Sequence, residues 1–198
     1  MIALQHLVKA TVWILLRLIY RVRVRGAYNL PESGAAILVP NHVSFIDAVL
    51  IAAHIQRPVR FAMYYKLYRR FKWIVAPMGA FPIAGKDENI RVYSEAFDIM
   101  HKTLMSGELL CLFPEGGITR DGELQPFRSG ILKVLRSDPV EIIPVGLHNL
   151  WGSYFSRKKK GLFKLPDHFM AKIEMRVGTP SRITNIPEME KRVAELLY

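Results

Sequence analysis

The chain of 198 residues has almost no cysteine, and its one thiol belongs to Cys111. A single cysteine excludes a framework of disulfides within the chain and is typical of a reducing compartment. Cys111 stands in an apolar run, which indicates a small core residue rather than a reactive nucleophile. The sequence also lacks the cysteine and histidine spacings of zinc sites, so we expect no metal.

Acidic residues are scarce relative to basic ones. There are 28 lysines and arginines against 17 aspartates and glutamates, which gives a net charge of +11. This excess predicts an anionic partner: a nucleic acid, an acidic membrane surface or a phosphate-bearing substrate. None of the signatures of nucleic-acid-binding folds is present, so we expect no nucleic acid as partner. The length and the hydrophobic fraction of 51% favour one folded domain, alone or with a small appendage.

A long uninterrupted apolar run is also missing. Residues 1–20 are mostly apolar, but Lys9 and Arg17 interrupt them, and charges near the centre of a spanning helix are costly. On a helix the polar side chains fall within one sector of about 120°, namely those of Gln5, His6, Lys9 and Arg17. We therefore predict an amphipathic, membrane-associated interfacial helix at residues 1–22 and an α/β domain at residues 23–198. The alternative is a helix that packs on its own domain.

Short apolar runs alternate with helical patterns along the rest of the chain. Strands are expected near residues 22–26, 35–39, 58–63, 79–83, 109–113, 141–147 and 171–177. Helices are expected near residues 46–53, 64–74, 88–105, 127–135 and 188–197. This alternation predicts an α/β fold with a largely parallel central sheet flanked by helices.

Two segments are strongly basic. Residues 64–74 mix aromatic and basic side chains, which favours a second surface helix in contact with lipid head groups, although nucleic-acid binders show similar mixtures. Residues 157–164 carry five positive charges and are expected to form a solvated loop.

The stretch from Asn41 to Asp47 follows a predicted strand and opens a predicted helix. His42 is then expected at the carboxyl end of the strand, where ligands bind in open α/β sheets. A carboxylate at Asp47 would reach one imidazole nitrogen and leave the other free as a general base. Ser44 and Asp47 also have the spacing of a capping box, in which Asp47 would only satisfy backbone amides.

A second turn, from Phe113 to Gly117, follows the predicted strand at residues 109–113. In a parallel sheet this turn opens on the same edge as His42, and brings a carboxylate and exposed glycine amides to one cleft. Arg120 and Arg128 come soon afterwards and are suited to holding a phosphate. Taken alone, the segment also fits an ordinary turn with a surface glutamate.

The two motifs, when they occur together in this order, are specific for one protein family. Asn41-His42-x4-Asp47 and Phe113-Pro114-Glu115-Gly116 resemble the glycerolipid acyltransferase family, which includes the 1-acylglycerol-3-phosphate acyltransferases. The resemblance extends from about residue 24 to residue 177. An apolar block with a proline at residues 142–145 looks like a later family motif.

The sequence departs from the family pattern at two places. Lys86 stands near the position where the family usually has an arginine after a short strand. The common Glu-Gly-Thr-Arg reads Glu115-Gly116-Gly117-Ile118 here, with the arginine displaced to Arg120. This variant resembles acyltransferase domains that act on other lysophospholipids.

The resemblance implies transfer of an acyl chain from acyl-CoA or acyl carrier protein to the free hydroxyl of lysophosphatidic acid, in phospholipid biosynthesis. It implies His42 as base and Asp47 as its orienter, with direct transfer and no cofactor. The substrate-binding set it implies is Asn41, Ser44, Lys86, Glu115, Gly116, Gly117, Arg120 and Arg128. Within that set, amides near Gly116 would stabilise an oxyanion, Glu115 would hold glycerol hydroxyls, and the basic residues would bind the phosphate.

The expected location is a membrane surface, on its cytoplasmic face. Two alternatives remain at this point. One is an acyltransferase for another lysophospholipid, and the other is a non-catalytic membrane-binding module.

Overall fold

The structure, a computed structural model, describes residues 2–153, 155, 156 and 171–198, and for residues 2–9 the backbone only. Strands β1 to β7 span Tyr20–Arg25, Ala36–Pro40, Val59–Tyr64, Ala80–Ile83, Leu109–Cys111, Glu141–His148 and Ala171–Val177. Helices α1 to α6 span Ile2–Ile19, Asp47–His54, Tyr65–Val75, Ile90–Met105, Gly130–Ser137 and Ile186–Leu197, and a short 3-10 helix spans Ala27–Asn29. The predicted basic loop at residues 157–164 lies outside the described residues.

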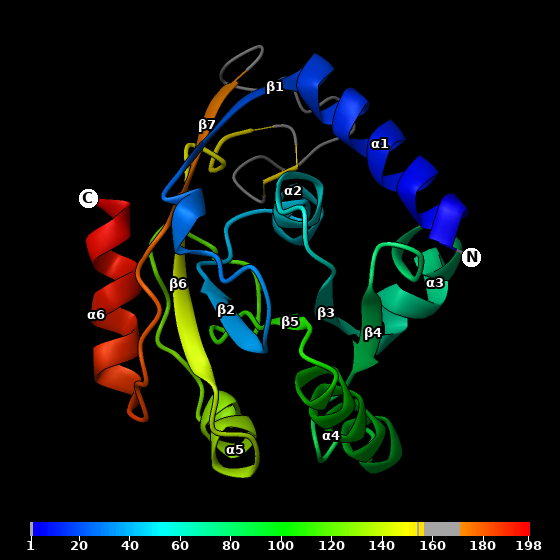
Figure 1. The fold of residues 1–198 in the computed structure, drawn as a ribbon, viewed down its shortest axis with the longest axis vertical. Coiled ribbons are helices and arrows are strands. Elements are labelled where there is room, and N and C mark those ends of the chain that lie inside the picture. The colour runs from blue at the N-terminus through cyan, green and yellow to red at the C-terminus, as the bar shows by residue number, and fades with distance from the viewer. Residues whose placement is uncertain (1, 154, 157–170) are drawn as a thin grey trace.

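The seven strands form one sheet in the order β1-β7-β6-β2-β5-β3-β4 (Figure 1). Neighbouring strands are parallel except β6 and β7, so β1 and β7 run opposite to the other five. The predicted α/β fold with a mostly parallel sheet is therefore confirmed. The parallel order places the carboxyl ends of β2 and β5 side by side, because β2 pairs directly with β5.

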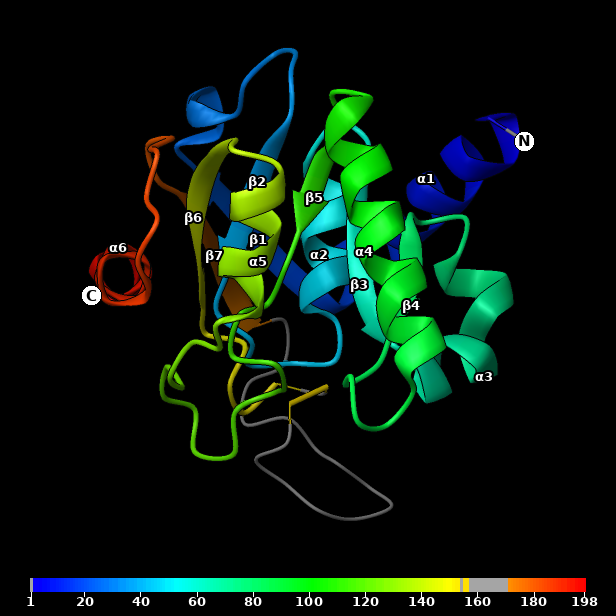
Figure 2. The ribbon, with the colours of Figure 1, turned by 90° about the horizontal axis from the view of Figure 1, so that it is seen from below.

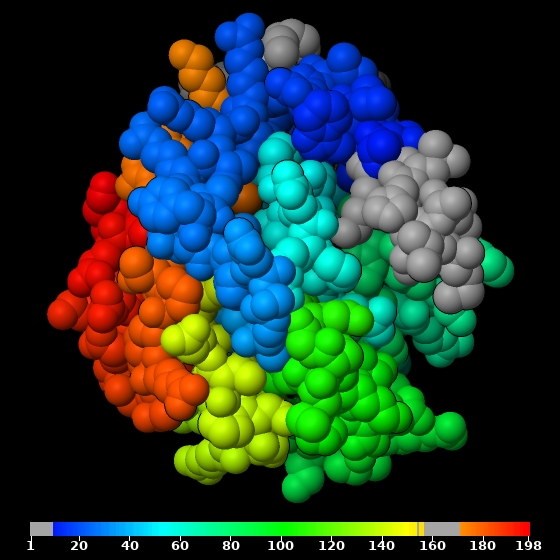
Figure 3. All heavy atoms as spheres, viewed as in Figure 1, coloured from blue at the N-terminus to red at the C-terminus, as the bar shows by residue number. Residues whose placement is uncertain are grey.

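Helices cover both faces of the sheet. Leu16 of α1 and Leu50 of α2 join a core cluster on one face. Met100 of α4, Val134 of α5 and Val193 of α6 join a second cluster on the other face. Every residue of β2 is buried, since alternate side chains enter the two clusters; this explains why its sequence is a continuous apolar run. In the space-filling view, the blue and cyan segments lie together and the red α6 lies along the left edge (Figure 3).

The N-terminal helix both packs on the domain and exposes apolar side chains. Leu16 is buried, whereas Ile14, Leu15 and Leu18 are more than half exposed. In the part of the chain that the structure describes, no helix is long and apolar enough to cross a membrane. The association of α1 with a membrane stays a prediction. The division at residue 22 also stays a prediction, although α1 ends at Ile19 and residues 20–22 lie in β1.

Several predicted boundaries differ from the structure by one to three residues, and two of them lie beside the second motif. The strand expected at residues 109–113 ends at Cys111, because the chain leaves the sheet before Pro114, which has no N–H to donate. The helix expected from residue 127 begins at Gly130, and the N–H of Arg128, in the loop before it, donates to the carbonyl of Pro114. Both deviations lie in the segment that carries the second motif.

Candidate active site

Asn41 joins the turn after β2 to the neighbouring strand β6. Its amide nitrogen Nδ2 donates to the carbonyl of Leu147 at 3.1 Å, and its Oδ1 accepts from the Leu147 N–H at 2.7 Å. Asn41 is buried, so the paired amide acts as one further rung of the sheet. These two hydrogen bonds fix Asn41 and thereby position the following residue, His42, at the edge of the sheet.

The partly exposed His42 pairs with the buried Asp47. The His42 Nδ1 lies 2.8 Å from Asp47 Oδ2, and the same oxygen accepts from the N–H groups of Val43 at 2.7 Å and Ser44 at 2.9 Å. This one carboxylate both satisfies the turn amides and contacts the imidazole. The full capping box is not formed, because the N-cap of α2 is Ile46 and it has no side-chain cap. Burial raises the pKa of Asp47, while the His42 hydrogen bond and charge act in the lowering direction.

The second imidazole nitrogen of His42, Nε2, is available to act as a base. The imidazole stacks on Phe113 with ring centroids 4.1 Å apart, and the histidine side chain is 19% exposed. No described residue hydrogen-bonds to its Nε2. Since Nδ1 faces Asp47, Nε2 is the nitrogen that can accept a proton from a bound hydroxyl. Ser44 is fully buried beneath this turn, where its Oγ accepts from the Ile46 N–H at 3.5 Å.

Glu115 joins the two motifs. Its Oε1 accepts from the His42 N–H at 2.6 Å, and its Oε2 accepts from the Gln125 N–H at 3.0 Å. Burial raises the pKa of Glu115 to about 7, although these two hydrogen bonds act in the lowering direction. Both oxygens have backbone partners, which makes Glu115 a residue that positions His42. Its role toward glycerol hydroxyls stays a prediction.

The loop after Glu115 passes under His42 and is fixed by Thr119. The Thr119 N–H donates to the carbonyl of His42 at 2.8 Å, and Thr119 Oγ1 donates to Asp121 Oδ1 at 2.7 Å. The Gly122 N–H donates to Thr119 Oγ1 at 3.1 Å. Sequence reasoning missed Thr119 and Gln125. The order Thr-x-Asp-Gly signals a side-chain-capped turn and was the available clue for Thr119.

The backbone N–H groups of Gly116 and Gly117 differ in their hydrogen bonding. The Gly116 N–H donates to the carbonyl of Phe113 at 3.0 Å, so it closes the turn. The Gly117 N–H has no hydrogen-bond partner among the described residues. Of the two amides expected to serve an oxyanion, Gly117 is therefore the open one.

Three basic residues, Lys86, Arg120 and Arg128, are predicted to bind the phosphate. Of these, Arg128 lies against the turn at Gly116. Gly116 has φ +71°, and a Cβ built there would lie 2.6 Å from Arg128 Nε. Lys86 follows β4, which is separated from β2 by β5 and β3. All three side chains are exposed, and neither Arg120 nor Lys86 contacts either motif through a described hydrogen bond or ion pair. Figure 2 shows the loop from β5 to α5 and the loop from β4 to α4 projecting from one edge of the sheet.

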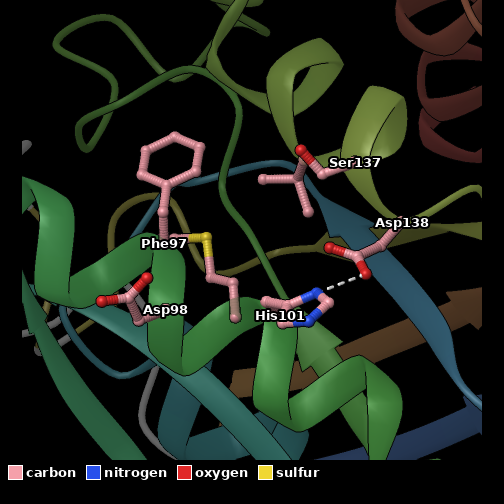
Figure 4. A pocket seen from close by; sticks show the side chains of 7 residues that line it. Phe97, Asp98, His101, Ser137 and Asp138 are labelled. Carbon is pink, nitrogen blue, oxygen red and sulfur yellow. Dashed lines mark hydrogen bonds and ion pairs between the residues drawn. The ribbon is translucent and has the colours of Figure 1, made fainter.

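A second histidine–aspartate pair lies elsewhere. His101 Nδ1 and Asp138 Oδ1 are 2.7 Å apart beside a cavity of about 280 Å³ between α4 and α5 (Figure 4). Both residues lie near the starts of β5 and β6, at the sheet edge opposite to His42. This pair ties two helices together and provides a matched control for the first.

An α/β domain with a mostly parallel sheet and a histidine–aspartate pair at the carboxyl ends of its parallel strands is equipped for general-base catalysis. The chain belongs to the Acyltransferase family, because the model of that family matches residues 21–148. Over 131 residues it is 27% identical to the chloroplastic 1-acyl-sn-glycerol-3-phosphate acyltransferase of Arabidopsis thaliana, covering 65% of this chain and 36% of the relative. A probable 1-acyl-sn-glycerol-3-phosphate acyltransferase of Mycoplasma pneumoniae is 24% identical, covering 87% of this chain and 66% of the relative.

The fold resembles that of a solved member. The crystal structure of the 1-acyl-sn-glycerophosphate acyltransferase PlsC of Thermotoga maritima matches with a TM-score of 0.69 and 19% identity, covering 98% of this chain and 76% of that one. The predicted family is confirmed by the family model, and the solved structure supports the predicted fold.

Proposed function

We propose that this protein transfers an acyl chain from a thioester of coenzyme A or acyl carrier protein to the free hydroxyl of lysophosphatidic acid, giving phosphatidic acid. The observation that carries the proposal is the His42 Nδ1–Asp47 Oδ2 contact of 2.8 Å, which leaves Nε2 as the available base. The names of the relatives, which are 1-acyl-sn-glycerol-3-phosphate acyltransferases, support the choice of acceptor.

The reaction needs a base because a hydroxyl is a poor nucleophile at neutral pH. His42 Nε2 takes the hydroxyl proton as the oxygen attacks the thioester carbonyl carbon. The resulting oxyanion lies near the Gly117 N–H. The carbon–sulfur bond then breaks, and the imidazolium returns the proton to the leaving thiolate. The thioester is already activated, so the proposal includes no cofactor.

Arg128 is the first candidate for binding the phosphate of the acceptor. Its guanidinium group lies against Gly116, next to the residue that holds His42. A guanidinium fork matches the geometry of a phosphate better than an ammonium group does. Arg120 and Lys86 remain further candidates for the same anion.

The acceptor and the product are lipids, so the enzyme is proposed to work at the cytoplasmic face of an anionic membrane. The exposed apolar residues of α1 and the exposed Arg17, Arg21 and Arg23 support this location. Each basic group near anionic lipid contributes about 1 kcal/mol to binding. A second candidate is an acyltransferase for another lysophospholipid, favoured by Gly117-Ile118 in place of the common Thr-Arg.

The test is thiol release from acyl-CoA, and from acyl carrier protein, with and without lysophosphatidic acid. We expect acceptor-dependent release from the wild type and none from His42→Ala. His101→Ala is the matched control, since it also removes a histidine paired with an aspartate and should keep full activity. Release that persists in folded His42→Ala contradicts the base assignment. Release with other lysophospholipids alone supports the second candidate, and no release with any acceptor supports a membrane-binding module.

A further inference from the structure

Helix α3 (Tyr65–Val75) is unusual because none of its 11 residues is buried. A helix in a globular domain normally buries one apolar stripe against a core. Here Trp73 is 91% exposed, Ile74 58% and Phe71 43%, and Leu67 lies one turn before Phe71. Large apolar side chains are therefore exposed on a helix that contributes no residue to the buried core and that bends at Phe71, where the backbone is not helical.

The charges of α3 have one sign. The helix carries Lys66, Arg69, Arg70 and Lys72 and no acidic residue. Lys66 pairs with Glu88 at 3.0 Å, and the other three have no ion pair within the described part of the chain. Arg70 lies over the ring of Phe71 at 5.6 Å, so cationic and aromatic groups are interleaved.

The place of α3 in the fold relates it to the active site. It starts directly after β3, at the same edge of the parallel sheet as His42. Figures 1 and 2 both show α1 and α3 on one side of the molecule. On α1 the same combination recurs, with Arg17 lying 4.6 Å from the ring centre of Trp13.

We propose that α3 is a second lipid-binding surface, which inserts Phe71, Trp73 and Ile74 into an anionic bilayer while Arg69, Arg70 and Lys72 contact its head groups. Anionic lipid is the occupant that matches both the unpaired positive charge and the exposed aromatic and aliphatic groups. This inference rests on the proposed function, because a lipid acceptor must reach the site from a membrane. Contact through α1 and α3 together would hold the carboxyl edge of the sheet at the bilayer surface.

Vesicle sedimentation of the full chain, without donor or acceptor, tests the surface. The probes are vesicles of phosphatidylcholine alone and vesicles of equal parts phosphatidylcholine and phosphatidylglycerol. We expect Trp73→Ser/Ile74→Ser to weaken binding to anionic vesicles by about tenfold or more, as expected for the loss of large apolar groups. Arg69→Glu/Lys72→Glu should reduce the preference for anionic vesicles, although the arginines next to α1 remain. The matched controls, Tyr28→Ser and Arg136→Glu, change exposed residues on other elements and should bind as the wild type does.

A fluorescence measurement locates the contact. In Trp13→Phe/Trp151→Phe, Trp73 is the one remaining tryptophan, and we expect its emission to shift to the blue and to be quenched by brominated lipid. Unchanged Trp73 emission on vesicles that bind the protein overturns the proposal. Normal vesicle binding by both α3 variants also overturns the proposal. This holds even if the variants lose acyl transfer from acyl carrier protein, because α3 would then bind that acidic protein and not lipid. Vesicle binding through α3 by a wild type that releases no thiol contradicts the enzyme function alone and supports the surface.

Discussion

The main-chain N–H of His42 donates a hydrogen bond of 2.6 Å to Glu115 Oε1, across 73 residues of sequence. The other Glu115 oxygen accepts from Gln125, so one carboxylate holds both the histidine turn and the loop that follows β5. The geometry of the proposed base thus depends on a residue of the second motif. This relationship makes specific predictions about Glu115.

Glu115→Gln should lower turnover more than it changes the KM for the acceptor. An amide has one oxygen, so either His42 or Gln125 would face an NH2 group, and a buried unsatisfied donor costs about 1–3 kcal/mol. The measurement is kcat and KM for lysophosphatidic acid, with urea unfolding to follow stability. A rise in KM with unchanged kcat would instead show that Glu115 binds the acceptor, as the family resemblance implies.

Stability should fall as the pH rises from about 4.5 to about 7. The native pKa of Glu115 is about 7 and its ordinary value is 4.5, so in this range the native state binds more protons than the unfolded state. The free energy of unfolding is then greatest below the ordinary pKa and decreases by at most about 3 kcal/mol. The raised pKa of Asp47 acts in the same direction.

Urea unfolding at about pH 5 and about pH 8 measures this effect, since the two values lie on either side of the native pKa of Glu115. The same comparison in Glu115→Gln provides the control, because the amide does not titrate. An identical pH dependence in the two proteins would assign the effect to other groups.

Asp47→Asn should reduce turnover by about 10²–10⁴ while costing little stability. The asparagine oxygen can still accept from Val43 and Ser44, but it cannot stabilise the imidazolium by charge. Asp47→Ala removes the acceptor altogether and should also destabilise the fold, by about 0.5–2 kcal/mol for the lost cap. Were Asp47 only a cap, the asparagine variant would keep nearly full turnover, so comparing the two variants by rate and by thermal unfolding decides its role.

Gly116→Ala should raise the KM for the acceptor. The new Cβ would lie 2.6 Å from Arg128 Nε and would displace the guanidinium group proposed to bind the phosphate. Gly34→Ala is a matched control, since Gly34 has a similar φ of +83° but nothing within 4 Å of the built Cβ. Both variants should lose similar stability, and only Gly116→Ala should change KM. Equal KM values in both would remove Arg128 from the phosphate site.

Local sequence patterns were sufficient to predict most elements of this fold. The strand before His42 could be predicted because its residues are uniformly apolar. They are apolar because all of β2 is buried. Boundaries near Pro114 and Arg128 were less accurate, because these residues belong to a loop held by non-local hydrogen bonds, such as Arg128 N–H to the Pro114 carbonyl, which have no periodic pattern. The reversed direction of β1 and β7 also has no signature in local periodicity.

The sequence by itself determined that His42 and Glu115 belong to one site. Each follows a buried strand, and the carboxyl ends of parallel strands open on one edge. Only the tertiary structure decided what each side chain does there. It joined Asn41 to Leu147 and Glu115 to the backbone of His42 and Gln125, and among the described residues it gave Nε2 of His42 no hydrogen-bond partner. These hydrogen bonds connect residues up to 106 positions apart, and such contacts are set by strand order and burial, which no local spacing encodes.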